Sequence, residues 1–247
     1  MTLNVAFSPP VIAHRGARKV APENTLSALR LAKEQGLGWV EVDAKLTMDG
    51  VPILMHDDTL DRTTDATGFV SDASWKMIQM LDCGSWFDPQ FAGEKIPRLT
   101  DVLQMVLESG LNVIVELKPC PRRAQATTMV TLIEMAKLWP EGDRLPIISS
   151  FDIESLVTAK QLLPHWPRLL LLAAWCEDWK TRMERAQASL IALRDDFITL
   201  ERIQKILEKQ KTIIAYTIDD PTRAKELLGW GVKAVISDNP REVMEKI

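Results

Sequence analysis

Short apolar runs alternate with helix-like segments along most of this chain. From residue 112 onward the alternation is regular. Strands are expected at 112–118, 146–151, 168–174, 189–194, 212–218 and 234–238. Helices are expected at 124–138, 153–163, 179–188, 200–210, 221–230 and 240–247. Strands that are nearly continuous apolar runs, separated by helices, indicate a parallel sheet that is buried on both faces.

Two further strand and helix units precede residue 112. Their strands are expected at 10–16 and 39–46, with 51–55 as an extension of the second, and their helices at 26–35 and 102–109. Gly36 and Gly110 follow these helices, where a C-cap is expected. Eight such units predict an α/β fold, the closed TIM (β/α)8 barrel. An open doubly wound sheet is the alternative, but no glycine-rich phosphate loop follows any strand.

Length and composition favour one domain. A chain of 247 residues is about the size of a single barrel, so one domain is expected over residues 1–247. Its composition, 46% hydrophobic and 26% charged, is that of an ordinary globular protein. Residues 57–98 break the alternation, because polar turns and one short helix candidate replace the apolar runs. We interpret 57–98 as a small insertion after the second strand.

The net charge, the cysteines and the N-terminal sequence limit the expected binding partners and cellular location. The net charge of −4 argues against a nucleic-acid binder that uses a general basic surface. The three cysteines are odd in number and lack metal-ligand spacing, which favours a reducing cytoplasm. The N-terminus lacks the basic start of a signal peptide, and no apolar run reaches the roughly 18 residues of a membrane span. We therefore expect a cytoplasmic protein without membrane insertion, and leave its oligomeric state open.

Charged side chains stand at the ends of three expected strands. In a TIM barrel the carboxyl ends of the strands carry the catalytic residues. These side chains are His14 and Arg15 after the first strand, Glu41 and Asp43 on the second, His56 after its extension, and Glu116 and Lys118 on the next. Burying many ionisable groups together costs several kcal/mol for each unpaired ion. The pattern therefore indicates an active site rather than a core.

The residue types in this group point to phosphate chemistry. Three carboxylates without a thiolate suit a hard divalent cation, Mg²⁺ or Ca²⁺, better than zinc. Histidine exchanges protons near neutral pH, so His14 and His56 could divide the work of general acid and general base beside a metal. Arg15 and Lys118 would hold an anionic substrate. Together these residues predict hydrolysis of a phosphate ester.

Some of these charged residues could also have a purely structural role. A single histidine after an apolar run is usually a hydrogen-bonded structural side chain, which is the better explanation of His14 taken alone. The presence of two histidines, each opposite carboxylates, instead favours a catalytic role for both. Glu41 and Asp43 would be solvated if their strand were an edge, and Glu116 with Lys118 could be a simple ion pair. His165 has no partner residues near it in sequence and is expected on the surface.

Several motifs carry a resemblance to a known family. They are HRG from His14, PENT from Pro22, the Glu41 and Asp43 pair, HDDTLDRTT from His56, LDCGSWFDPQFAGEKIPRL from Leu81, ELK from Glu116 and SDNP from Ser237. Over residues 12–240 the chain resembles the glycerophosphodiester phosphodiesterase family, in its short cytoplasmic bacterial type. Two histidines with a carboxylate pair between them make this resemblance specific.

The resemblance implies a TIM barrel that hydrolyses glycerophosphodiesters to sn-glycerol 3-phosphate and an alcohol with Mg²⁺ or Ca²⁺. The family pattern assigns His14 and His56 as the acid/base pair, Glu41, Asp43 and Glu116 as metal ligands, and Arg15 and Lys118 as phosphate contacts. Trp86, Phe151 and Tyr216 are candidates for the walls of the glycerol pocket. Attack on phosphorus by the substrate's own hydroxyl, through a cyclic phosphate, and direct attack by water are both open.

Two positions depart from the family pattern. Tyr216 stands where tryptophan is frequent, and Arg194 begins a charged run where relatives tend to have a neutral polar residue, so the preferred alcohol is open. Two other functions are compatible with the barrel. One is a lyase-like relative that stops at the cyclic phosphate, and the other is a catalytically silent phosphodiester-binding protein. The retained charged motif residues argue against the silent protein.

Overall fold

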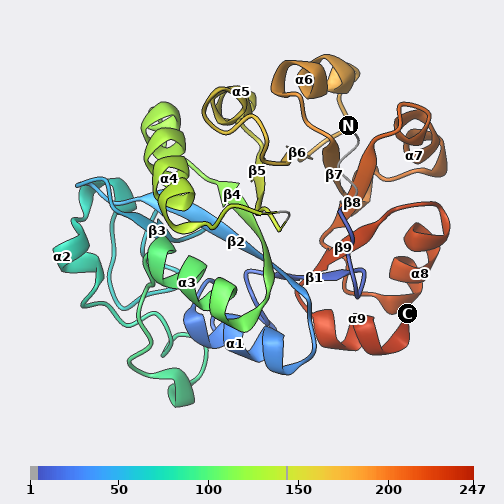
Figure 1. Cartoon of the computed structure of the whole chain (residues 1–247). Helices are drawn as coiled ribbons and strands as arrows, with labels where there is room; N and C mark the ends of the chain where they lie inside the picture. Colours follow the sequence, from blue (N-terminus) through green and yellow to red (C-terminus); the bar gives the residue numbers. More distant parts are fainter. Residues whose placement is uncertain (1–4, 143) are drawn as a thin grey trace.

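Eight parallel strands form the centre of the molecule. The computed structural model describes residues 5–142 and 144–247. The strands are β1 (Val11–His14), β2 (Trp39–Leu46), β4 (Asn112–Leu117), β5 (Ile147–Ser150), β6 (Arg168–Leu172), β7 (Leu190–Arg194), β8 (Thr212–Tyr216) and β9 (Ala234–Ser237). β1 pairs with both β2 and β9, so the sheet closes into a barrel (Figure 1). The predicted TIM barrel is confirmed, and each strand lies within its expected range.

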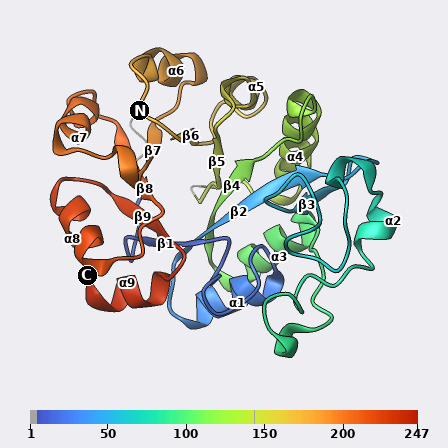
Figure 2. The same ribbon diagram turned by 180° about the vertical axis from the view of Figure 1, so that it is seen from behind.

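A helix follows each parallel strand and covers the outside of the barrel (Figure 2). These helices are α1 (Leu26–Glu34), α3 (Leu99–Ser109), α4 (Ala124–Leu138), α5 (Ile153–Leu162), α6 (Trp179–Ala186), α7 (Leu200–Leu207), α8 (Pro221–Gly229) and α9 (Pro240–Lys246). Side-chain caps fix several of their starts. The Thr25 hydroxyl accepts from the Ala28 amide before α1, and the Asp152 carboxylate accepts from the Ser155 amide before α5.

The alternation of side chains along the strands separates two apolar layers. One layer packs between the strands and the helices, and the other fills the barrel. The inner layer consists of Ile12, Trp39, Ile114, Ile147, Leu169, Leu171, Leu190, Ala192, Ile214, Ala234 and Ile236. Residues two positions apart share a face, so the inner face continues toward the carboxyl ends with His14, Glu41, Glu116 and Ser149. The same alternation that builds the core therefore aims polar groups into the barrel mouth.

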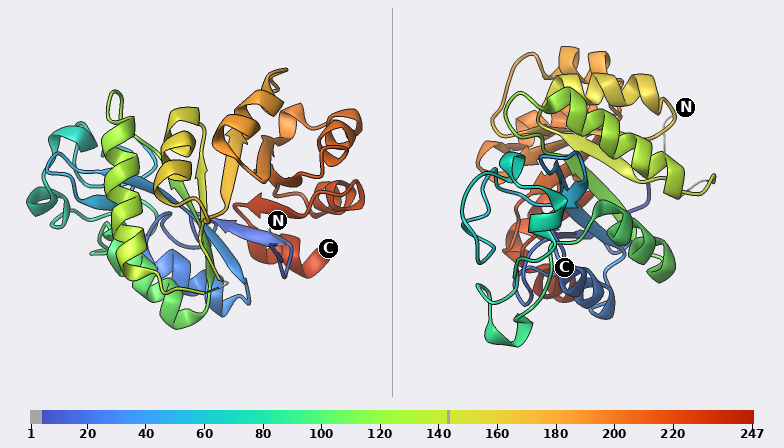
Figure 3. Two further views of the ribbon diagram at one scale, coloured as in Figure 1. Left: turned by 45° about the horizontal axis from the view of Figure 1, so that its top comes forward. Right: turned by 90° about the vertical axis from the view of Figure 1, so that its left-hand side faces the viewer.

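The chain between β2 and α3 extends to one side of the barrel (Figure 3). It begins with β3 (Pro52–Leu54), which pairs antiparallel with the carboxyl end of β2, and contains α2 (Trp75–Ile78) and two single-turn 3₁₀ helices at Val70–Asp72 and Pro89–Phe91. Ile53, Leu60 and Ile78 belong to a separate apolar cluster inside this segment. The Met55 amide donates to the Asp43 carbonyl at 3.0 Å. His56 consequently follows directly beside the carboxylates of β2.

None of the described helices is long and apolar enough to span a membrane. The expectation about an N-terminal leader concerns residues 1–16, of which residues 1–4 lie outside the described part of the chain.

Candidate active site

The carboxyl ends of β1, β2 and β4 border a cavity of about 200 Å³. Of the residues predicted for the site, those that line it are His14, Arg15, Glu41, His56, Glu116, Lys118, Phe151 and Tyr216. Asp43 joins Glu41 and Glu116 in one acidic group. Trp86 is not among the described residues that line the cavity. Its indole nitrogen donates to the Cys83 carbonyl at 2.8 Å, and its ring contacts Phe87.

A tight turn after β1 sets the place of Arg15. Arg15 and Gly16 both have left-handed backbones, with φ of 56° and 85°. A Cβ at Gly16 would lie 2.7 Å from the Cβ of Ala28 in α1, closer than real side chains approach. Only glycine fits this contact without strain. The turn therefore packs against α1 directly after His14, and the Arg15 amide lies 3.3 Å from the Glu41 carboxylate.

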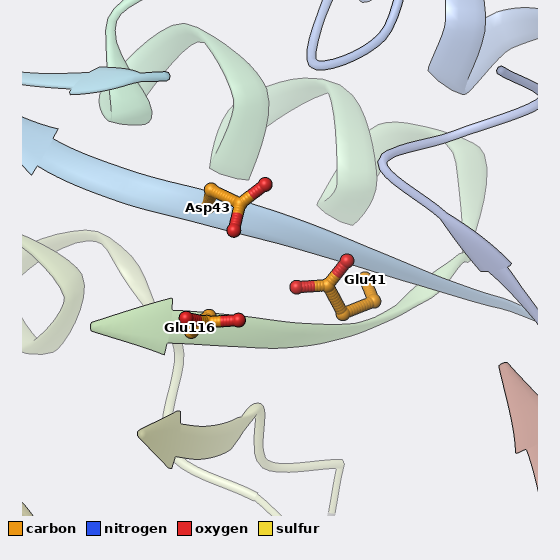
Figure 4. A group of neighbouring side chains, drawn as sticks. All are labelled: Glu41, Asp43 and Glu116. Carbon is orange, nitrogen blue, oxygen red and sulfur yellow. The ribbon is translucent and has the colours of Figure 1, made fainter. Parts of the chain in front are cut away.

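Three carboxylates meet beside the cavity (Figure 4). Glu41 and Asp43 are successive inward residues of β2, and Glu116 faces them from β4, in register with Asp43. Oxygen atoms of the three groups all lie within 4.8 Å of one another. The residues are 4%, 1% and 7% exposed, respectively. Two rigid neighbouring strands thus hold a buried, negatively charged group.

Burial and mutual repulsion change the pKa values of these carboxyl groups. Burial, followed by the charge of Asp43, raises the pKa of Glu41 well above its usual value and the pKa of Glu116 to about 7. Burial also disfavours ionisation of Asp43, but the charges of Arg15 and Lys118 outweigh it and lower the pKa of Asp43. Asp43 is therefore ionised, while Glu41 and Glu116 experience a repulsion that a further cation would relieve.

Side chains already in contact with Asp43 hold it in place. Arg15 Nε lies 3.1 Å and Lys118 Nζ 3.5 Å from its carboxylate oxygens, and Lys118 Nζ also lies 3.0 Å from Glu116. The Asn24 side chain donates to Asp43 Oδ2 at 2.8 Å and accepts from the Asp43 amide at 3.1 Å. Sequence analysis did not assign Asn24 to the site, although PENT contains it.

The acidic group fits a hard divalent cation. Its three donors are carboxylates, the ligands that Mg²⁺ and Ca²⁺ prefer, and no thiolate lies among the described residues of the group. Burial, followed by the negative charge of Asp43, raises the pKa values of Glu41 and Glu116, so the neighbouring Arg15 and Lys118 do not offset these two effects completely. The chemistry and spacing of these donors could therefore hold such an ion.

Each cavity histidine contacts an aspartate through Nδ1. His14 Nδ1 lies 2.5 Å from Asp238 Oδ1, and His56 Nδ1 lies 2.6 Å from Asp57 Oδ1. His14 Nε2 lies 3.9 Å from Glu41. Burial is the largest cause that lowers the pKa of His56. A carboxylate acceptor at Nδ1 leaves Nε2 of the neutral ring free to accept a proton. Sequence analysis assigned neither aspartate a role in the site, although HDD and SDNP contain them.

Aromatic rings and one hydroxyl complete the cavity wall. Phe151 and Tyr216 pack edge to face, with ring centroids 6.1 Å apart, and Lys118 Nζ lies 5.8 Å from the centroid of the Phe151 ring. The Tyr216 hydroxyl donates to the Leu172 carbonyl at 2.8 Å. Ser149 lines the cavity and is 1% exposed, and its hydroxyl has no hydrogen-bond partner within the described part of the chain. Its inward place in strand 146–151 was the only sequence signal for it.

Fold and site together define a class of protein. A TIM barrel whose strand ends gather buried carboxylates, two histidine–aspartate pairs and two cations around one cavity is an enzyme for an anionic substrate. Residues 14–242 match the glycerophosphoryl diester phosphodiesterase family, and the chain belongs to that family. The family predicted from the sequence motifs is confirmed.

Relatives and solved structures match almost the whole chain. The glycerophosphodiester phosphodiesterase of Caldanaerobacter subterraneus is 32% identical over 242 residues, which are 96% of this chain and 97% of that protein. The glycerophosphodiester phosphodiesterase of Bacillus subtilis is 30% identical over 243 residues, 93% of this chain and 83% of that protein. A phosphodiesterase of Oleispira antarctica, solved in complex with the product sn-glycerol-3-phosphate, matches with a TM-score of 0.93 and 34% identity and covers 96% of both chains.

Proposed function

We propose that this chain catalyses the metal-dependent hydrolysis of glycerophosphodiesters to sn-glycerol 3-phosphate and an alcohol. The observation that carries the proposal is one cavity in which a buried group of three carboxylates lies beside two histidine–aspartate pairs. The similar phosphodiesterase of Oleispira antarctica, solved with sn-glycerol-3-phosphate, supports this choice of product.

In this proposal the cavity binds the substrate through charge and shape. Arg15 and Lys118 line the cavity and contact the phosphate. Phe151 and Tyr216 form the walls beside the glycerol carbons, and the Ser149 hydroxyl offers a hydrogen bond to a glycerol hydroxyl. Trp86 lies outside this arrangement because it does not line the cavity.

Glu41, Asp43 and Glu116 would hold the divalent cation, Mg²⁺ or Ca²⁺. When bound, the cation offsets negative charge on the phosphate oxygens. The protein supplies the remaining chemistry through its own side chains. By holding that cation, the three carboxylates would set the position of the phosphate relative to His14 and His56.

His14 and His56 act as the acid/base pair. With Nδ1 directed to an aspartate, each ring exchanges its proton at Nε2. One neutral ring removes the proton from the attacking hydroxyl, which belongs either to the substrate's glycerol or to water. The other ring, protonated, gives its Nε2 proton to the departing alcohol oxygen. If the glycerol hydroxyl attacks, the two roles reverse while water opens the cyclic phosphate.

We also propose a cytoplasmic location and a single working domain with residues 57–98 as an insertion. Cys83, Cys120 and Cys176 are free, which agrees with a reducing compartment. Cell fractionation tests the location, and recovery of the native protein outside the cytoplasm would contradict it.

Product release tests the function. Wild type is expected to release sn-glycerol 3-phosphate from glycerophosphocholine with Mg²⁺ or Ca²⁺ and to stop after chelation. His56→Ala is expected to lose at least about 100-fold of this activity, because general acid–base catalysis contributes about 10²–10⁴-fold. His165→Ala is the matched control, because His165 is exposed between α5 and β6. Metal-independent release, full activity of His56→Ala, or a cyclic phosphate as the final product would contradict the proposal.

A further inference from the structure

Glu23 is a buried carboxylate that contacts three arginines around the active site. It lies in the turn between β1 and α1, and its side chain is 3% exposed. Arg15 Nη1 donates to it at 2.7 Å, Arg18 Nη2 lies 3.1 Å away, and two Arg62 nitrogens donate at 2.8 and 2.9 Å. The described residues that line the 200 Å³ cavity do not include Glu23. Glu23 is therefore connected to residues of the cavity through other side chains, such as Arg15.

One of these arginines connects Glu23 to His14. Arg18 contacts Glu23 with Nη2 and donates from Nη1 to Asp238 at 3.3 Å. Asp238 is the residue whose Oδ1 lies 2.5 Å from His14 Nδ1. Asp219 holds the turn that carries Asp238, because its carboxylate accepts from the amides of residues 238 and 239 at 2.8 and 3.2 Å. Glu23 is thus connected to His14 through Arg18 and Asp238, and Asp219 holds Asp238 in place.

A second arginine connects Glu23 to His56. Arg62 comes from the segment between β3 and α3, and it forms two hydrogen bonds to Glu23 and two to Asp57, the latter at 2.6 and 3.1 Å. Asp57 Oδ1 lies 2.6 Å from His56 Nδ1. Bidentate arginine contacts fix orientation as well as distance. The two histidine–aspartate pairs therefore share one central carboxylate.

The charge of Glu23 is what keeps this arrangement together. Burial opposes its ionisation, but hydrogen bonds from Arg62 and the charges of Arg15 and Arg18 outweigh burial and lower the pKa of Glu23 to about 2. Neutralising a buried carboxylate leaves its cationic partners without compensation, so they rearrange or draw in water. Loss of this single charge would consequently disturb both histidines.

We propose that Glu23 is a positioning residue that orients His14 and His56 together, through Arg18 and Asp238 on one side and Arg62 and Asp57 on the other. This inference rests on the proposed acid/base function of the two histidines. It predicts that Glu23 acts on the proton transfers, while the acidic group and Lys118 continue to bind cation and substrate.

Kinetics of Glu23→Gln test the proposal against a matched control. Glu94→Gln is that control, because Glu94 accepts from the Ser27 amide and hydroxyl at the start of α1 and has no contact with the three arginines. Glu23→Gln is expected to lower kcat by about 10- to 100-fold with KM changed by less than about threefold. Glu94→Gln is expected to keep wild-type values. A rise in KM with kcat unchanged would instead assign Glu23 to phosphate binding through Arg15.

Leaving-group dependence distinguishes misplaced histidines from general damage. A glycerophosphodiester of p-nitrophenol needs no protonation of its leaving group, so only the general base matters for it. The kcat loss in Glu23→Gln is therefore expected to be smaller with this ester than with glycerophosphocholine, yet not abolished. Equal losses with both substrates would overturn the proposal.

Two further measurements keep the proposal testable if Glu23→Gln fails to fold. Arg62→Gln removes a side chain that is 41% exposed, and it is expected to lower kcat with KM changed by less than about threefold, as in Glu23→Gln. In proton NMR, the Nδ1–H signals of the two cavity histidines are expected to shift in Arg62→Gln for His56 and in Arg18→Gln for His14. Unchanged signals would overturn the positioning role, whereas active His14→Ala and His56→Ala variants would refute only the acid/base function.

Discussion

Single residues of this site are held by charge against the cost of burial. A buried ion loses several kcal/mol of hydration unless close partners compensate it. The partners that compensate Asp43 are Arg15 at 3.1 Å, Lys118 at 3.5 Å and the side-chain amide of Asn24 at 2.8 Å. Removing any of these partners leaves a charge that cannot reach water. Substitutions at such positions therefore act more strongly than at exposed ion pairs, which contribute about 0–1 kcal/mol.

The compensation of the buried Glu23 charge can be measured as a dependence of folding stability on pH. Its pKa is lowered from 4.5 to about 2 in the folded protein, so between these pH values the unfolded chain binds more protons than the folded one. Its stabilisation is complete above about pH 4.5 and is lost as pH falls toward 2, by about 3 kcal/mol in total.

Urea unfolding of wild type and Glu23→Gln at several acidic pH values measures this effect. Because glutamine does not titrate, the difference between the two proteins isolates Glu23 from the other carboxylates. The stability advantage of wild type is expected to shrink steadily as the pH falls from about 4.5. An advantage that is independent of pH would refute a lowered pKa for Glu23.

At the scale of elements, the turn from β1 into α1 depends on close contact. Gly16→Ala would add a Cβ at 2.7 Å from the Ala28 Cβ on a backbone with φ of 85°. Left-handed strain and overpacking together are expected to cost about 2–4 kcal/mol of unfolding free energy. Gly50→Ala is the matched control, because Gly50 has φ of 83° with nothing within 4 Å of the added atom. Chemical denaturation of both variants measures the two costs, and equal costs would contradict the packing argument.

The elements themselves were predictable because local patterns determine them. Apolar runs bounded by turns located all eight parallel strands, and the residues at their carboxyl ends indicated the cavity. The supporting contacts were not predictable in this way. Asp238 and His14 are 224 positions apart, and Arg62 and Glu23 are 39 apart, so no local period reports their contact. Trp86 was a candidate wall residue and does not line the cavity in the described part of the chain, since an aromatic residue in an insertion gives no information about where its ring points.

At the scale of the whole molecule, the site depends on closure of the barrel. β1, from the start of the chain, pairs with β9 near its end, and that pairing brings the SDNP turn to His14. Arg62 attaches the lateral segment to Glu23 of the barrel at the same place. The complete set of charged contacts therefore exists only in the folded chain. A cation bound by Glu41, Asp43 and Glu116 of this site stabilises the folded state relative to the unfolded state.

Thermal unfolding with and without a divalent cation tests this linkage. At a cation concentration about 100-fold above its Kd, the folded state gains about 2.7 kcal/mol, which is about 5–10 °C in Tm for a chain of this size. The gain arises because the cation relieves repulsion between Glu41 and Glu116, whose pKa values burial and Asp43 raise. Glu41→Gln is expected to lose most of the shift, and NaCl at equal ionic strength is expected not to reproduce it. Removing one carboxylate of this group weakens the binding of the cation. A shift of equal size in Glu41→Gln would therefore mean that the cation binds elsewhere.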